Sequence, residues 1–331
     1  MNSYLALTAD RQRLLCEEAE PRTGLIPTSI EKDFWVCWTL RELFSLPEWG
    51  AQLTFKGGTA LAKCWKLIER FSEDIDVVIN RRFLGFDAEK LSNKQLNKLR
   101  EVCSERIKTE LKPLLGESIA KRIPATETWS LDVDKTDPDQ QTLLFKYPSR
   151  FSREGSYIRP EVKIELGARS DTEPVESPDI QPILAETFPD KLTESTFSVR
   201  AVAARRTFWE KAMLLHEETY RPVEKTRKAR MARHYYDLWC LINRGIARAA
   251  IEDAGLFERI AAHRQIFFRY SWMDYTTQAR GRLRLLPLED QIAYWRNDYA
   301  AMQTEMFYGE PPEFDEVLKK VKEFERGFNG S

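Results

Sequence analysis

The chain of 331 residues is long enough for two medium domains or one large one. Its 51 basic and 52 acidic residues leave a net charge of −1, so any binding of nucleic acid has to be local. Five widely spaced cysteines and three histidines indicate free thiols in a reducing compartment, and neither a disulfide framework nor a structural zinc site. Because no signal peptide or membrane span is apparent, we expect a cytoplasmic protein with no membrane partner.

The first third of the chain predicts helix, strand, helix and strand in turn. Residues 28–46 have a broad apolar face, begin with Thr28 and Glu31 at capping-box spacing, and stop before Pro47. The segments that follow are a strand at 53–56 ending in a Gly-Gly turn, a helix at 59–70 and a β-branched strand at 74–80.

The middle of the chain predicts one long charged helix and three strands. The helix is expected at residues 92–123, and the strands at 128–134, 142–148 and 161–168. In the last strand Val162, Ile164 and Leu166 face one way, whereas Lys163 and Glu165 face the other. This alternation is typical of a strand with one buried face.

A proline-rich acidic stretch at residues 170–190 predicts a surface loop near a domain boundary. We therefore expect an N-terminal α/β domain at residues 1–195 and a mostly helical C-terminal domain at residues 196–331.

Two helices are predicted early in the C-terminal domain. Residues 207–220 begin with a second capping-box pattern, Thr207 and Glu210, and residues 231–245 end at Gly245. The remainder of the chain is expected to be mostly helical.

Two aspartates, Asp74 and Asp76, stand one residue apart in the strand predicted at 74–80. Residues i and i+2 of a strand point to the same face, so the two carboxylates would lie side by side. Adjacent carboxylates repel unless a cation lies between them, and Mg²⁺ prefers carboxylate oxygens. Two such ions, about 4 Å apart, stabilise the attacking and leaving oxygens of a phosphoryl transfer.

The Gly-Gly turn before them predicts a phosphate site. Gly57 and Gly58 let the backbone approach a ligand closely, and the helix that follows directs its first N–H groups toward the turn. Thr59 either caps this helix or binds a phosphate oxygen, and Lys63 adds a positive charge one turn later. Together with the aspartates, this order indicates an active site that transfers a nucleotide.

Simpler interpretations exist for each part alone. A D-x-D pattern is usually a solvated strand edge, and Asp132 and Asp134 form a second one with no glycine turn before it. Glu165 is the best candidate for a third acid, which would complete metal binding or accept the proton of the nucleophile. An ion pair with Lys163 on a solvated face explains Glu165 equally well.

The order of Gly-Gly, helix and D-x-D strand is similar to the signature of the polymerase-β-like nucleotidyltransferase fold. The fuller segment "FKGGTALAKCWKLIERFSEDIDVVI" closely resembles the AbiEii/AbiGii toxin family of bacterial nucleotidyltransferases. "IEKDFWVCWTLRELF" resembles the N-terminal helix of that family, "RTFWEKAMLLHEE" its third motif and "RHYYDLWCLI" its fourth. The resemblance covers roughly residues 27–245 and implies an α/β core with a small mixed sheet, followed by a helical lobe that closes the cleft.

The resemblance assigns nucleotide or metal binding to residues of the first two motifs. Those expected at the triphosphate are Gly57, Gly58 and Thr59, with Lys63 nearby, and the small hydroxyl expected near phosphate or metal is Ser72. Asp74 and Asp76 are expected to bind Mg²⁺.

The resemblance also implies roles for two residues of the later motifs. Lys211 is expected to contact the phosphates of the nucleotide, and Asp237 to act near the acceptor or as a base. From the residues alone, Lys211 would be a solvated charge and Asp237 a partner of Arg233.

The implied reaction is transfer of a nucleoside monophosphate from an NTP to an acceptor hydroxyl, with two Mg²⁺ ions as cofactors and pyrophosphate as leaving group. Family members serve type IV toxin–antitoxin and phage-defence systems, so a DNA-binding antitoxin encoded nearby is an expected partner. Several members modify the 3′ end of tRNA. Two alternatives remain, namely a protein or small-molecule acceptor, and a nucleotide-binding regulator without catalysis, which the intact motifs disfavour.

One local charge asymmetry agrees with an RNA acceptor. From Arg221 to Arg233, both included, there are six basic residues and one acid, and Tyr235 and Tyr236 follow. These residues would meet an RNA backbone and stack on bases, or else form a solvated basic loop. Residues 266–287 are rich in aromatics and arginines, and the arginines there would extend such a surface: Arg280, Arg282 and Arg284.

Overall fold

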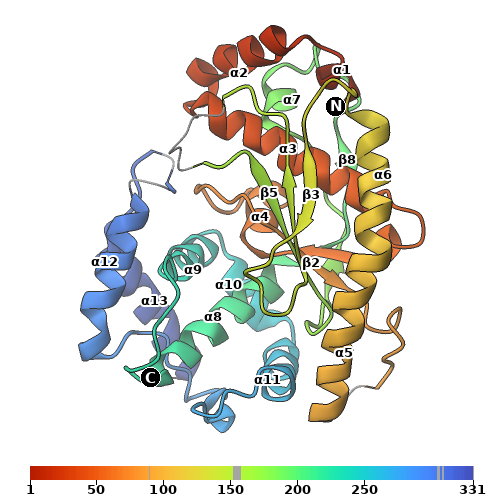
Figure 1. Cartoon of the computed structure of the whole chain (residues 1–331). Helices are drawn as coiled ribbons and strands as arrows, with labels where there is room; N and C mark the ends of the chain where they lie inside the picture. Colours follow the sequence, from red (N-terminus) through yellow and green to blue (C-terminus); the bar gives the residue numbers. More distant parts are fainter. Residues whose placement is uncertain (89, 152–157, 304–305, 308, 331) are drawn as a thin grey trace. The chain divides into compact units, whose positions relative to one another are not determined.

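The computed structural model describes residues 1–88, 90–151, 158–303, 306–307 and 309–330 (Figure 1). The chain divides into two compact units: unit 1 comprises Met1–Cys64 and Phe71–Ala201, and unit 2 comprises Trp65–Arg70 and Val202–Ser331. The chain therefore passes between the units three times, and a six-residue segment between two parts of unit 1 belongs to unit 2. No helix in the described ranges is long and apolar enough to cross a membrane.

Unit 1 contains a mixed sheet and several helices. The helices are α1 (Asn2–Leu5), α2 (Ala9–Thr23), α3 (Pro27–Phe44), the 3-10 turn η1 (Gly50–Gln52), α4 (Gly57–Lys63), α5 (Asn93–Arg106), the π-helical η2 (Ile107–Leu111), α6 (Lys112–Arg122) and α7 (Ile183–Thr187). The strands are β1 (Leu53–Lys56), β2 (Ile75–Ile79), β3 (Ser130–Val133), β4 (Thr142–Lys146), β5 (Glu161–Gly167), β6 (Val175–Glu176), β7 (Asp179–Ile180), β8 (Phe197–Ser198) and β9 (Ala201–Val202), the last of which spans the boundary of the units.

Seven strands form one sheet in the order β3-β4-β5-β2-β1-β9-β6. β1 and β2 pair antiparallel, whereas β2 and β5 pair parallel, so the predicted mixed sheet is confirmed. The predicted long helix is also confirmed, as α5, η2 and α6 in succession. The alternation in β5 has the expected consequence, because Val162, Ile164 and Leu166 are all buried.

The core of unit 1 lies between α3 and the sheet (Figure 1). Trp38 of α3 stacks on Phe145 of β4 with ring centroids 5.8 Å apart, and Trp35 stacks on Tyr147 at 5.2 Å. All four rings are buried, and burial of a large aromatic side chain contributes about 1.5–3 kcal/mol. The packing fixes α3 across the strands that carry the acidic residues.

Both predicted capping boxes are wrong. Helix α3 begins at Pro27 with Ile26 as N-cap, and Glu31 instead accepts hydrogen bonds from Ser149 Oγ and the Arg150 N–H. Proline is favoured in the first turn because it has no N–H to satisfy. Helix α8 begins at Ala204, so Thr207 lies inside it.

The helix predicted at residues 59–70 is much shorter. α4 ends at Lys63, and residues 65–70 run without regular structure into unit 2, where Arg70 forms an isolated bridge with Phe307. The apolar residues beyond Lys63 have helical spacing, but the segment that carries them belongs to unit 2 and does not form a helix.

Unit 2 is helical, as predicted. Its elements are α8 (Ala204–Tyr220), α9 (Arg233–Asn243), α10 (Ile246–Glu252), α11 (Leu256–Phe267), η3 (Tyr275–Thr277), η4 (Glu289–Gln291), α12 (Ile292–Gln303) and α13 (Phe314–Asn329). α8, α9 and α10 pack on one another, and α13 packs on α9 (Figure 1). Buried aromatic rings fill the interior, with Trp209 against Phe257 and Phe328.

Candidate active site

Gly57 and Asp76 are in direct contact where β1 turns into α4. Gly57 has φ +83°, a conformation that disfavours residues with a Cβ. A Cβ added at Gly57 would lie 2.1 Å from Asp76 Oδ2. The antiparallel register that pairs Lys56 with Asp76 produces this approach. Glycine is therefore required at this position for two reasons, namely the positive φ of its backbone and the lack of space for a Cβ beside Asp76. Gly58 is half-buried as the second residue of α4.

Three carboxylates come together beside this turn. Asp76 is the second residue of β2, and Glu165 is its direct partner in the parallel strand β5. Asp74 is exposed and lies one residue before β2, so the expectation that both aspartates are on the strand is wrong for Asp74. The pairing of β2 with β5 thus brings Glu165, the predicted third acid, next to Asp76, although the two residues are far apart in sequence.

Burial, together with the neighbouring carboxylates, raises the pKa values of Asp74 and Asp76. Burial and then the charge of Glu165 raise the pKa of Asp76 to about 7, against the opposing charge of Lys56. Asp74 is more exposed, but a partial loss of hydration, followed by the charges of Glu165 and Glu73, also raises its pKa. Both carboxylates are thus short of positive charge in this arrangement.

Two lysines compensate the acids in part. Lys56, opposite Asp76 in the sheet, donates to Ser170 Oγ at 3.3 Å, and Lys163 pairs with Glu165. The pairing of Lys163 with Glu165 is the simpler interpretation allowed by the sequence, and it coexists with the position of Glu165 beside Asp76. Sequence reasoning missed Lys56, although antiparallel pairing of the strands in "FKGG" and "DID" would have indicated it.

A divalent cation fits this donor set. Asp74 and Asp76 are acidic oxygen donors whose pKa values are raised by burial and then by neighbouring carboxylates, and a hard cation would stabilise their charged forms. In the described ranges, no three His, Cys, Asp or Glu residues form a ready-made metal cluster. The fit therefore rests on the two aspartates, with Glu165 adjacent.

Thr59 fixes the segment that carries Ser72 and Asp74. The buried Thr59 hydroxyl donates to the Asp74 carbonyl oxygen at 2.5 Å, and its oxygen lies 2.9 Å from Ser72 Oγ. Having one proton, Thr59 donates it to Asp74 and accepts from Ser72. The side chain of Thr59 thus connects α4 to the residues before β2.

Lys63 has a partner within unit 1. Its ammonium lies 2.6 Å from Asp33 Oδ1, while Asp33 Oδ2 accepts the N–H of Ile183 at the start of α7. Burial by itself lowers the pKa of Lys63, but the Asp33 carboxylate outweighs it and raises the pKa above its ordinary value. Lys63 therefore ties α4 to α3, and much of its charge is already compensated.

A separate polar cluster in unit 2 surrounds Asp237. This fully buried carboxylate accepts Arg70 Nε at 2.7 Å and Arg70 Nη2 at 2.8 Å, and Lys211 Nζ lies 2.6 Å from Oδ2. Burial alone would raise the pKa of Asp237, but Arg70 and Lys211 hold it well below its usual range. The sequence suggested Arg233 as the partner of Asp237, and the structure adds Arg70 and Lys211, which are distant from Asp237 in sequence.

Lys211 and His234 belong to the same cluster. Lys211 is buried rather than a solvated charge, and its ammonium lies 3.4 Å from His234 Nδ1. Burial lowers the pKa of Lys211, with Arg70 adding to the effect and Asp237 opposing it. Burial and the charge of Lys211 hold the pKa of His234 well below its ordinary value, so the neutral ring accepts at Nδ1. No sequence signal had indicated Arg70.

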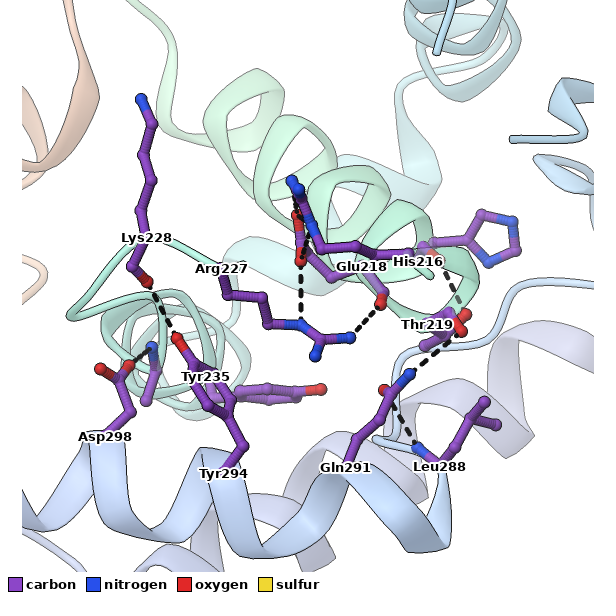
Figure 2. A network of polar contacts seen from close by, with 12 residues as sticks. His216, Glu218, Thr219, Arg227, Lys228, Tyr235, Leu288, Gln291, Tyr294 and Asp298 are labelled. Carbon is purple, nitrogen blue, oxygen red and sulfur yellow. Dashed lines mark hydrogen bonds and ion pairs between the residues drawn. The ribbon is translucent and has the colours of Figure 1, made fainter. Parts of the chain in front are cut away.

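The basic run is ordered by acids that the sequence did not connect to it. Arg221 and Arg227 both pair with Glu218, at 2.7 Å and 3.1 Å, as Figure 2 shows for Arg227. The backbone N–H groups of Arg230 and Ala232 donate to Asp298, which the same figure includes. Two of the six cations of this segment, Arg221 and Arg227, are thus held by Glu218, and its backbone is held by Asp298.

The two tyrosines after the basic run are not available for stacking on bases. Tyr235 is 1% exposed and donates to the Leu285 carbonyl, and Tyr236 is 4% exposed. The prediction that they meet a nucleic acid is wrong, because they face the interior of the helical unit.

The chain matches one protein family over most of its length. The family model described as "Nucleotidyl transferase AbiEii toxin, Type IV TA system" matches residues 38–320. No curated protein matches. Among solved structures, the chain is similar to MenT4, a nucleotidyltransferase toxin from Mycobacterium tuberculosis H37Rv, with 18% identity, 90% of this chain and 99% of that chain covered, and a TM-score of 0.38. The family match extends across both units.

Proposed function

This chain belongs to the AbiEii family of nucleotidyl transferase toxins of type IV toxin–antitoxin systems, and from this membership we propose that it transfers a nucleoside monophosphate from an NTP to the 3′ end of a tRNA. It is a nucleotidyltransferase, and membership of a toxin–antitoxin family implies an antitoxin partner. The observation that carries the proposed chemistry is the group of Asp74, Asp76 and Glu165 beside the Gly57 turn.

In the proposed reaction, the acceptor hydroxyl forms a new bond to the α-phosphorus as the bond to the pyrophosphate oxygen breaks. Asp74 and Asp76 would hold Mg²⁺, which supplies charge neutralisation at the transferred phosphate when bound. The contact of Asp76 with Gly57 at the start of α4 supports a metal position beside that turn, and the phosphates would lie next to it with Gly58 and Ser72 as further contacts.

The proton of the attacking hydroxyl needs an acceptor, and we assign it to Glu165. Its position opposite Asp76 supports this role. Asp237 suits the role less well, because it is fully buried and both of its oxygens are held by Arg70 and Lys211. We therefore assign Asp237 to orienting Lys211, the third-motif lysine.

The test is transfer of labelled NTPs, supplied one at a time, onto total tRNA, with RNA and protein pools separated afterwards. Asp76→Asn is expected to lower transfer by about a hundred-fold or more, because a catalytic metal contributes several kcal/mol of charge stabilisation. Asp132→Asn is the matched control, since Asp132 belongs to the other D-x-D pattern and is exposed on β3. Full activity of Asp76→Asn, or label in the protein pool alone, would refute the proposal.

A further inference from the structure

Unit 2 carries a pair of stacked rings at its surface. Tyr270 and Trp272 lie with ring centroids 4.8 Å apart and planes within 8° of parallel. Tyr270 is 38% exposed, one of few large apolar side chains so exposed among the described residues, and Trp272 is half-buried. Because Arg221 lies over Trp272, a further planar group would stack on the exposed Tyr270 ring.

The backbone before Tyr270 is strained. α11 ends at Phe267, and Arg269 then adopts φ +45°, a conformation that costs on the order of 1 kcal/mol for a residue with a Cβ. The Tyr270 N–H donates to the hydroxyl of Tyr275 at 3.2 Å, which holds the turn. A strained backbone conformation persists where the surrounding contacts hold it. Here the strained turn precedes the exposed ring of Tyr270 directly.

Guanidinium groups extend the stack. Arg221 lies over the Trp272 ring at 5.2 Å, and Arg284 lies over the ring of Tyr220 at 5.4 Å. Tyr220 is the last residue of α8 and Arg221 its C-cap, so the pair Arg284–Tyr220 and the stack Arg221–Trp272–Tyr270 make up one series of contacts in two parts. We call this series the stacking strip: Tyr220, Arg221, Tyr270, Trp272 and Arg284.

Glu218 fixes one end of the strip. It accepts hydrogen bonds from Arg221 and from Arg227, and Arg227 in turn lies over the Tyr294 ring at 5.4 Å (Figure 2). The hydroxyl of Tyr294 donates to the Lys228 carbonyl, which secures the adjoining loop. Ordering of the strip therefore costs little entropy when a ligand binds, because the side chains are already held.

Exposed cations belong to the strip itself, as Arg284 does, or to the loop that follows Arg221, as Lys225 and Lys228 do. Within the described ranges, the structure gives no acidic partner to Arg284, Lys225 or Lys228, and all three are exposed. Figure 2 shows the Lys228 side chain extending away from the polar network. Free cations next to an exposed ring stack favour a ligand that has both anionic groups and planar rings.

We propose that the stacking strip binds unpaired nucleotides of an RNA strand, with bases on the rings and phosphates at Lys225, Lys228 and Arg284. Unpaired bases stack on aromatic and guanidinium planes, whereas bases within a duplex do not expose their faces. The inference deepens the proposed function and rests on it for the identity of the acceptor as RNA. In this proposal the rings of the stacking strip, and not Tyr235 and Tyr236, stack on the bases.

Binding of a labelled single-stranded oligoribonucleotide to the full chain, followed by fluorescence anisotropy, tests the proposal. Tyr270→Leu is expected to weaken binding about ten-fold, the effect of removing one stacked base. Tyr270→Phe keeps the ring and is expected to bind as the unchanged chain does. The same strand annealed to its complement should bind more weakly and respond little to Tyr270→Leu.

Lys228→Gln provides a second readout at an exposed position. The variant is expected to lower the slope of log Kd against log salt concentration by about one, since one phosphate contact is lost and one fewer counterion is released on binding. Unchanged RNA affinity in Tyr270→Leu overturns the inference, and so does a loss confined to binding of a protein partner such as the antitoxin. The proposed function fails separately, if the unchanged chain transfers no nucleotide to RNA while it still binds the oligonucleotide.

Discussion

At the scale of single residues, Gly57 shows why the first motif needs glycine. Its backbone is in the left-handed region, and its missing side chain leaves the space that Asp76 Oδ2 occupies. Gly85 has nearly the same φ, +86°, with no atom within 4 Å of an added Cβ. Substitution of each glycine therefore distinguishes the effect of backbone strain, which both positions share, from the steric contact with the carboxylate, which only Gly57 has.

Gly57→Ala is expected to lower transfer by about a hundred-fold, because a displacement of about 1 Å at a reacting centre has effects of that size. Gly85→Ala should lose only about 1 kcal/mol of stability through backbone strain and keep its transfer rate. Labelled-NTP transfer and urea unfolding of both variants check this. Equal transfer rates in the two variants would contradict the importance of the Gly57–Asp76 contact.

At the scale of elements, α4 is held to the segment before β2 by one hydroxyl. Thr59→Val keeps the shape of the side chain but leaves the Asp74 carbonyl and the Ser72 hydroxyl without their partner. The expected loss is about 1–3 kcal/mol in the free energy of unfolding. Thr59→Ser retains the hydroxyl and should lose clearly less. Urea unfolding measures both, and a Thr59→Val variant as stable as the unchanged chain would show that the bridge is unimportant.

At the scale of the whole molecule, Asp237 joins sequence-distant parts of unit 2. Its carboxylate binds Arg70, from the short segment 65–70, and Lys211 of α8. Asp237→Asn leaves two buried cations without their counter-ion, so a loss of about 3–5 kcal/mol is expected at pH 7. Because the folded-state pKa is depressed, the stabilisation is present above the unfolded pKa of about 3.9 and is lost as pH falls toward the folded pKa.

The difference in unfolding free energy between Asp237→Asn and the unchanged chain should therefore narrow by about 1 kcal/mol between pH 5 and pH 3. Urea unfolding at pH 3, 5 and 7 measures it. A difference that stays constant over this range would mean that Asp237 is not held ionised by its partners.

The sequence by itself determined the local features and the family. The glycine turn before an acidic strand, the apolar face of α3 and the alternation in β5 are short-range patterns, and short-range patterns reflect the burial of nearby side chains. They were sufficient to single out Asp74 and Asp76 as candidate site residues.

Only the tertiary structure decided which distant groups meet. Glu165 reaches Asp76 because β5 pairs parallel with β2, Lys63 binds Asp33, and Arg70 binds Asp237. Ion pairs of this kind depend on which helices and strands pack together, and that choice is made by the burial of the whole chain rather than by neighbours in sequence. The same reason placed Tyr235 and Tyr236 in the interior and left Tyr270 and Trp272 at the surface.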